Sequence, residues 1–261
     1  MHHGIEWNLR IKLLWKIFIC FVFAIVARST VAQDFTFAII GDRTGDVQPG
    51  VYEKICQEVD RAKPAFAINV GDTIQGKNDG SADREWAEIQ PLLKHRFPLY
   101  LVPGNHDIWS DASERSWRVA TKRAPFYSFD YKNAHFTVLD NSRTEDLSPD
   151  QMRFLERDLA AHRSARWKLV IFHRPFWLIP VMFRNSSFEL HRIAKEYGVT
   201  HVVSGHSHRY GMWTLEGVTY LMMGSSGGHL RGAIPDDGWF FHWVEARVQG
   251  DSLDLIVHKL N

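Results

Sequence analysis

The sequence predicts an α/β fold in which two β-sheets stack against each other with helices outside them. Between residues 35 and 204, short apolar runs alternate with stretches of helical periodicity. From residue 210 onward the pattern changes to strands and turns only. No repeat, linker or low-complexity tract interrupts this order, so residues 33–261 are predicted to form one domain.

The first 32 residues have the pattern of a signal peptide. A segment with three cationic side chains precedes the 11 apolar residues 17–27, and small residues end at Ala32. The alternative is an uncleaved anchor, but this run is shorter than the roughly 20 residues of a spanning helix. We therefore expect cleavage near Ala32, export to the periplasm or the extracellular space, and a mature chain without a membrane span.

Cleavage would also change the charge of the chain. It removes four Lys/Arg residues and one Asp/Glu residue, so the formal net charge falls from +1 to −2. A chain without a concentrated positive field has nothing to attract the phosphate backbone of DNA or RNA. Nucleic acid is therefore not an expected partner.

In the first half of the domain, the predicted strands cover residues 35–40, 66–70 and 99–102. Helices are expected over 49–63 and over 83–93, where Pro91 breaks or kinks the second one. Residues 108–125 show no clean period and are predicted to be a long loop over the site.

In the second half, residues 127–131 and 136–139 flank a turn and predict a hairpin. A capping box at Ser148 opens a helix through Ala161, and a second helix runs from Ser186 to the stop at Gly198. The remaining predicted strands are residues 168–172, 202–204, 212–215, 218–223, 241–248 and 253–258.

Five predicted strands end in turns that carry side chains suited to binding metals. Because ligands bind beyond the carboxyl ends of strands in open α/β sheets, these side chains are expected to meet at one place. They are Asp42, Asp72, Asn105, His173, His206 and His208. The histidines outside these motifs, including His135 and His162, are predicted to be surface or core residues.

Three carboxylate or amide oxygens and three imidazoles are too many ligands for one ion. They suit two ions, Mn, Fe or Zn, that share a bridging carboxylate. Two such ions can clamp a phosphoryl group and lower the pKa of a bridging water. His106 lies beside Asn105 and before Asp107, and an imidazole oriented by a carboxylate is a good proton donor to a leaving oxygen.

Five motifs resemble those of the calcineurin-like metallophosphoesterases, which include the purple acid phosphatases. In family order they are GDRTG at 41–45, GDT at 71–73, GNHD at 104–107, FHRP at 172–175 and GHSH at 205–208. The resemblance implies a four-layer αββα sandwich of two mixed sheets. It also implies that Asp72 bridges two metals, that Asn105, His173 and His206 bind the second, and that Asp42 and His208 bind the first.

The sequence departs from the family at the first metal. The family usually has a histidine where this chain has Thr44, and the purple acid phosphatases have a tyrosine where it has Gln75. Either side chain, or a water, is left to complete the first site. Arg43 and Arg174, beside the ligands, are candidates for binding phosphate oxygens, with a solvated or ion-paired role as the alternative.

The function expected from these residues is an exported, two-metal phosphoesterase that hydrolyses small phosphomonoesters or phosphodiesters. The alternative is a non-catalytic protein that binds metal or phosphate, because the first metal site lacks a ligand.

Overall fold

The computed structural model of the chain describes residues 34–260, so the predicted signal peptide lies outside the described residues. The strands of this part form two mixed sheets. The first sheet has five strands in the order β11-β10-β1-β2-β3. These strands are β1 (Phe35–Ile40), β2 (Ala67–Asn69), β3 (Leu99–Leu101), β10 (His242–Gln249) and β11 (Ser252–Lys259). The first three run parallel, and β10 pairs with β1 in the antiparallel sense.

The second sheet has six strands in the order β4-β5-β6-β7-β9-β8. Its strands are β4 (Tyr127–Tyr131), β5 (Ala134–Val138), β6 (Trp167–Ile171), β7 (His201–Ser204), β8 (Gly211–Leu215) and β9 (Val218–Met222). The four inner strands run parallel, and the edge strands β4 and β8 each pair antiparallel with their neighbour. The parallel strands therefore end at the same edge.

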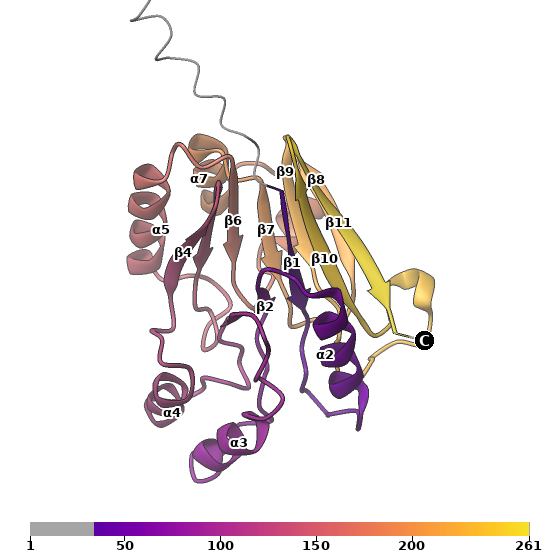
Figure 1. Cartoon of the computed structure of the whole chain (residues 1–261). Helices are drawn as coiled ribbons and strands as arrows, with labels where there is room; N and C mark the ends of the chain where they lie inside the picture. Colours follow the sequence, from indigo (N-terminus) through magenta and orange to yellow (C-terminus); the bar gives the residue numbers. More distant parts are fainter. Residues whose placement is uncertain (1–33, 261) are drawn as a thin grey trace, which may run out of the picture. The chain divides into compact units, whose positions relative to one another are not determined.

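Helices pack on the outer face of each sheet (Figure 1). The helices are α2 (Val51–Ala62), α3 (Ala82–Ile89), α4 (Asp111–Thr121), α5 (Pro149–Ala161), α6 (Leu178–Met182) and α7 (Glu189–Tyr197), with a short 3₁₀ turn at Pro235–Asp237. Helix α2 covers the first sheet, and α5 and α7 cover the second. This confirms the predicted αββα sandwich.

The central core lies between the two sheets and is rich in phenylalanine. Phe37 of β1 and Phe66 stack with ring centroids 5.0 Å apart, and both meet the edge of Phe136 from β5. Large apolar side chains that face each other bury much surface and so favour the stacking of the sheets. None of the helices in residues 34–260 combines the length and the apolar character needed to cross a membrane.

The prediction of a loop over residues 108–125 is wrong, because α4 occupies most of it. Ser110 caps this helix through the backbone N–H of Ser113. Only Ser113 and Trp117 of α4 are buried, so no apolar stripe marks the helix in the sequence. Trp117 packs edge-on against Trp86 of α3 at 5.6 Å, and this contact fixes α4 beside the motif at 104–107.

Candidate metal centre

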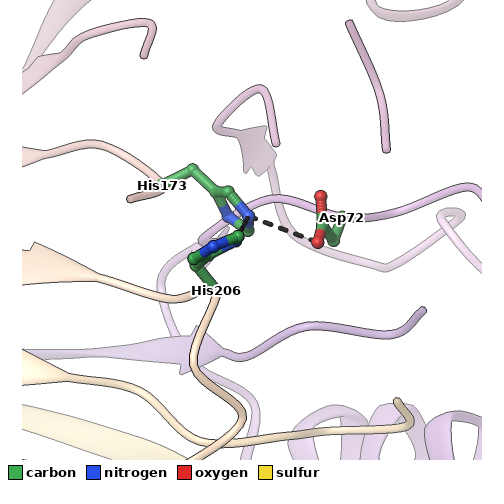
Figure 2. Close-up of side chains that lie close together, drawn as sticks. All are labelled: Asp72, His173 and His206. Atoms are coloured by element: carbon green, nitrogen blue, oxygen red, sulfur yellow. Dashed lines mark hydrogen bonds and ion pairs between the residues drawn. The ribbon is translucent and has the colours of Figure 1, made fainter. Parts of the chain in front are cut away.

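The predicted metal ligands gather at the edge where the parallel strands end. Asp42 and Asp72 follow β1 and β2, which are neighbours in the first sheet, and His173 and His206 follow β6 and β7, which are neighbours in the second. Figure 2 shows the imidazoles of His173 and His206 turned toward the carboxylate of Asp72. The two sheets thus present carboxylates from one side and imidazoles from the other.

The ligand atoms form two groups that share one residue. Asp42, Asp72 and His208 form the group of the predicted first metal, and Asp72, His173 and His206 form that of the predicted second, each with ligand atoms within 4.8 Å of one another. In the group of the first metal, Nε2 of His208 lies 3.4 Å from Oδ2 of Asp42. In the group of the second, Nε2 of His173 lies 3.2 Å from Oδ2 of Asp72 and 3.3 Å from Nδ1 of His206. Asp72 is the residue that the two groups share.

Two buried oxygens in this region have no hydrogen-bond partner within residues 34–260. They are Oδ1 of Asp42 and Oδ1 of Asn105. A buried acceptor without a partner costs free energy, roughly 1–3 kcal/mol, unless something supplies positive charge or a proton. Both residues belong to the predicted ligand set, so their unpartnered oxygens fit the binding of a cation.

Two of the imidazoles are held by hydrogen bonds on the nitrogen that faces away from the other ligands. Nδ1 of His173 donates to the carbonyl of Val70 at 2.9 Å, and Nδ1 of His208 donates to the carbonyl of His229 at 2.6 Å. Such bonds fix the orientation of each ring, and they would leave the lone pair of Nε2 for a metal ion once the ring is neutral.

The backbone around the ligands is crowded and strained. Asp72, His206 and His208 have φ values of 56°, 71° and 56°, in the left-handed region that non-glycine residues rarely adopt. A Cβ on Gly104 would lie 2.2 Å from Oδ1 of Asp72, and one on Gly205 would lie 2.4 Å from Oδ1 of Asp42. Strain of this kind persists where surrounding structure enforces it, as it does at functional sites.

The charges of the ligands are coupled. Burial lowers the pKa of an imidazole, but the Asp72 carboxylate beside it raises the pKa of His173 to about 9. Burial and the nearby charges of His173 and Arg174 lower the pKa of His206 to about 3. Without metal the centre therefore keeps a proton on His173, and a cation bound there would have to displace it.

A profile of the calcineurin-like phosphoesterases matches residues 35–210. The chain belongs to this family. It is similar to purple acid phosphatase 15 of Arabidopsis thaliana, at 27% identity, over 57% of this chain and 33% of that protein. Among solved structures, it resembles a purple acid phosphatase from yellow lupin (Lupinus luteus) seeds, with a TM-score of 0.66 at 18% identity over 88% of this chain and 52% of that one. It also resembles GAP50, the anchor in the inner membrane complex of Plasmodium, with a TM-score of 0.55 at 15% identity over 87% and 89%.

The chain spans only about a third of the curated phosphatase and about half of the lupin enzyme. The likeness to the solved structures shows the fold. The family match ends at residue 210, whereas β10 and β11 lie beyond it and complete the first sheet.

The acid candidate of this family member, His106, is oriented by a different group from the one expected. Its Nδ1 donates to the carbonyl of Gln75 at 2.5 Å. The Asp107 carboxylate accepts instead from the backbone N–H groups of Thr73, Ile74 and Gly104, at 2.8, 3.1 and 2.9 Å. The buried Asp107 carboxylate thus links the turn after Asp72 to the turn before Asn105 by accepting hydrogen bonds from the backbone of both. The expected contact between Asp107 and the His106 ring was wrong.

Thr44 and Gln75, which stand where the family has a further ligand to the first metal, contact each other. The hydroxyl of Thr44, which is fully buried, donates to the side-chain oxygen of Gln75. Gln75 thus contacts Thr44 through its side chain and His106 through its carbonyl. This pair brings two neutral oxygens to the corner of the centre where the family has an imidazole.

The two arginine candidates have partners of their own. Arg43 donates to the carbonyl of Thr73 at 3.0 Å, and Arg174 donates to Glu145 at 2.6 Å. In both, the Nε atom is buried without a hydrogen-bond partner in the part of the chain described. Arg174 acts on the pKa of His206, which places its charge close to the ligands.

The sequence marks His229 as an exposed histidine of a loop, but it does not show that the backbone of residues 224–229 holds the site. The hydroxyl of Ser226 accepts from the N–H of Gly41 at 2.8 Å, and the N–H of Gly228 donates to the carbonyl of Asp42 at 3.2 Å. The carbonyl of His229 accepts the hydrogen bond from Nδ1 of His208. Arg231, just beyond, also acts on the pKa values of His206 and His208. The only signal in the sequence is a run of small residues after a predicted strand, which is typical of any tight turn.

Proposed function

We propose that the chain is a metal-dependent phosphoesterase whose centre binds two metal ions. The observation that carries the proposal is the position of Asp72, which belongs to both groups of ligand atoms. Two bound ions would supply Lewis-acid polarisation of a phosphoryl oxygen and a water of lowered pKa. The donor set of carboxylate, amide and imidazole suits Mn, Fe or Zn.

The chain's own residues would perform the remaining steps. Since Nδ1 of His106 is held by Gln75, its Nε2 is the nitrogen that would hand a proton to the leaving oxygen. Arg174 would add positive charge beside the phosphoryl group, with its unpartnered Nε as a donor. Asp107 would hold the turns of Asp72 and Asn105 in register.

The purple acid phosphatases among the relatives support a phosphomonoester as the substrate, and phosphodiesters are the second class to test. A non-catalytic role is the alternative. Two observations favour it: the first site lacks the family's further ligand, and the relative GAP50 is described as an anchor in a membrane complex.

A screen of phosphomonoesters against phosphodiesters, with and without added Mn²⁺, Zn²⁺ or Fe, tests the proposal. We expect turnover that depends on added metal and stops on chelation. A protein that binds metal and phosphate but shows no metal-dependent turnover of either class would establish the non-catalytic alternative.

The first metal is expected to bind more weakly than the second, because Thr44 and Gln75 offer neutral oxygens in place of an imidazole. Thr44→His should tighten this site by about tenfold or more, comparable to the effect of a well-placed metal-supporting residue. Thr44→Val is the matched control, since it keeps the volume and removes only the hydroxyl. Metal content and activity are measured together during titration of the apo-protein. Two equally tight sites in the wild type would contradict this expectation.

We also propose that the protein is exported. The basic and apolar pattern of residues 1–32 supports cleavage before Gln33. Amino-terminal sequencing of exported protein should begin there, whereas an intact Met1 on membrane-bound protein would contradict it.

A further inference from the structure

A second cluster of histidine and aspartate lies away from the phosphoesterase centre. It consists of Asp130 near the end of β4, His135 near the start of β5, and His162 at the C-terminal end of α5, and we call it the α5 cluster. Because β5 is parallel to β6, its start lies at the edge opposite to His173. One strand of five residues spans about 15 Å, so the two sites are separate.

The geometry points to a third metal site, and we propose that the α5 cluster binds Zn²⁺ or a similar borderline divalent ion. Asp130, His135 and His162 each offer one ligand atom within 4.8 Å of the others, and we take Nδ1 of His135 and Nε2 of His162 as the ligands because these nitrogens are the ones near Asp130. Two imidazoles and a carboxylate, with a water in the fourth position, form a common donor set for this ion.

In each imidazole, the nitrogen that points away from Asp130 donates a hydrogen bond to Asp158. Nε2 of His135 donates to Asp158 at 2.8 Å, and Nδ1 of His162 donates to the carbonyl of Asp158 at 2.7 Å. Asp158 is 7% exposed and also accepts from the hydroxyls of Ser128 and Thr137, at 2.8 and 2.7 Å. Metal-binding histidines are usually oriented by a carboxylate or a carbonyl that accepts a hydrogen bond from the ring nitrogen not bound to the metal. Asp158 supplies both kinds of acceptor here.

The near nitrogens then face Asp130 with their lone pairs when the rings are neutral. Nδ1 of His135 is hydrogen-bonded to one carboxylate oxygen of Asp130 at 2.7 Å, and Nε2 of His162 lies 3.6 Å from the other. Without metal, a proton shared between Nδ1 of His135 and Asp130 occupies this position, and a bound cation would replace it. Ligand atoms around a tetrahedral ion with bonds of about 2.0–2.1 Å are roughly 3.4 Å apart, so the exposed Asp130 carboxylate would have to draw back from its hydrogen bond with His135 to admit an ion. The two negative charges of Asp130 and Asp158 would balance the double positive charge of a divalent ion.

One ring must move for an ion to enter. The rings of His135 and His162 stack with centroids 3.7 Å apart and planes 12° from parallel. An imidazole binds an ion in the plane of its ring, so one ion cannot serve two parallel rings. His162 is 32% exposed and lies at a helix end, whereas His135 is 1% exposed. The proposal therefore includes a tilt of His162 out of the stack.

The experiment counts Zn²⁺ bound by the metal-free full-length protein at a fixed, buffered free Zn²⁺ concentration. We expect His162→Gln to bind one ion fewer per chain than the wild type. This difference does not depend on how many ions the phosphoesterase centre takes, so it holds even if the proposed function fails. Asp130→Asn changes a 59% exposed side chain and is the second variant, in case His162→Gln disturbs folding. His258→Gln, at a histidine paired with Glu245 in the first sheet, is the matched control and should keep the full count.

Spectra of the imidazole nitrogens give an independent check. On addition of Zn²⁺, Nδ1 of His135 and Nε2 of His162 should change while the far nitrogens stay protonated. An equal count of ions in the wild type and both variants would overturn the proposal, and would mean that protons fill the α5 cluster.

Discussion

Asp72→Asn is expected to lose bound metal at both positions of the centre and to lose nearly all phosphoesterase activity. The Asp72 carboxylate belongs to both ligand groups, and its charge balances His173 at 3.2 Å. An amide keeps the shape but removes the charge. Two ions contribute several kcal/mol of transition-state stabilisation, so the loss in kcat/KM should be about 1,000-fold or more.

Asp46→Asn is the matched control for this change. Asp46 is an exposed residue of the loop after Asp42, and its φ of 77° is in the left-handed region, as is that of Asp72. The control therefore makes the same Asp-to-Asn change in a similar backbone conformation. Metal content by mass spectrometry and activity should be measured together, with circular dichroism to confirm folding. If Asp72→Asn keeps two ions per chain and normal turnover, the bridging role is wrong.

His106→Asn should slow substrates with poor leaving groups by about 100-fold or more, and those with good ones, such as nitrophenol, much less. A proton donor matters only where the leaving oxygen needs the proton. The position of His106, with Nδ1 on the Gln75 carbonyl, leaves Nε2 for this transfer. The measurement is kcat/KM across a series of aryl and alkyl phosphates of increasing leaving-group pKa.

The slope of that series separates two roles for His106. A proton donor makes the wild type nearly insensitive to leaving-group pKa and the variant steeply sensitive. Equal losses for every substrate would show that His106 positions the phosphoryl group instead. Metal content should stay at the wild-type level, because the His106 ring belongs to neither ligand group.

The elements of the fold were largely predictable, and helix α4 is an exception with a physical cause. Buried strands have runs of apolar residues, and α2, α5 and α7 have an apolar face, so local pattern marks them. Helix α4 has one large buried side chain, Trp117, and depends on its contact with Trp86. A helix that buries only one large side chain leaves no apolar period in the sequence.

The order of strands within each sheet was decided by the tertiary structure. Strand β10 lies beside β1, although some 200 residues of chain separate them. Pairing over such a distance depends on which apolar faces meet in the core, and not on any local pattern.

For the site, the sequence by itself predicted which polar residues gather at one edge, because turns after buried parallel strands carry their side chains there. It did not determine what orients those side chains. The carbonyl of Gln75 behind His106, the carbonyl of His229 behind His208 and the amides around Asp107 are backbone groups, present in every residue type. The pairing of His135 with His162 is likewise tertiary, since a strand and a helix end brought them together. Side-chain identity is written in the sequence, but the direction of a carbonyl or an amide follows only from the folded path of the chain.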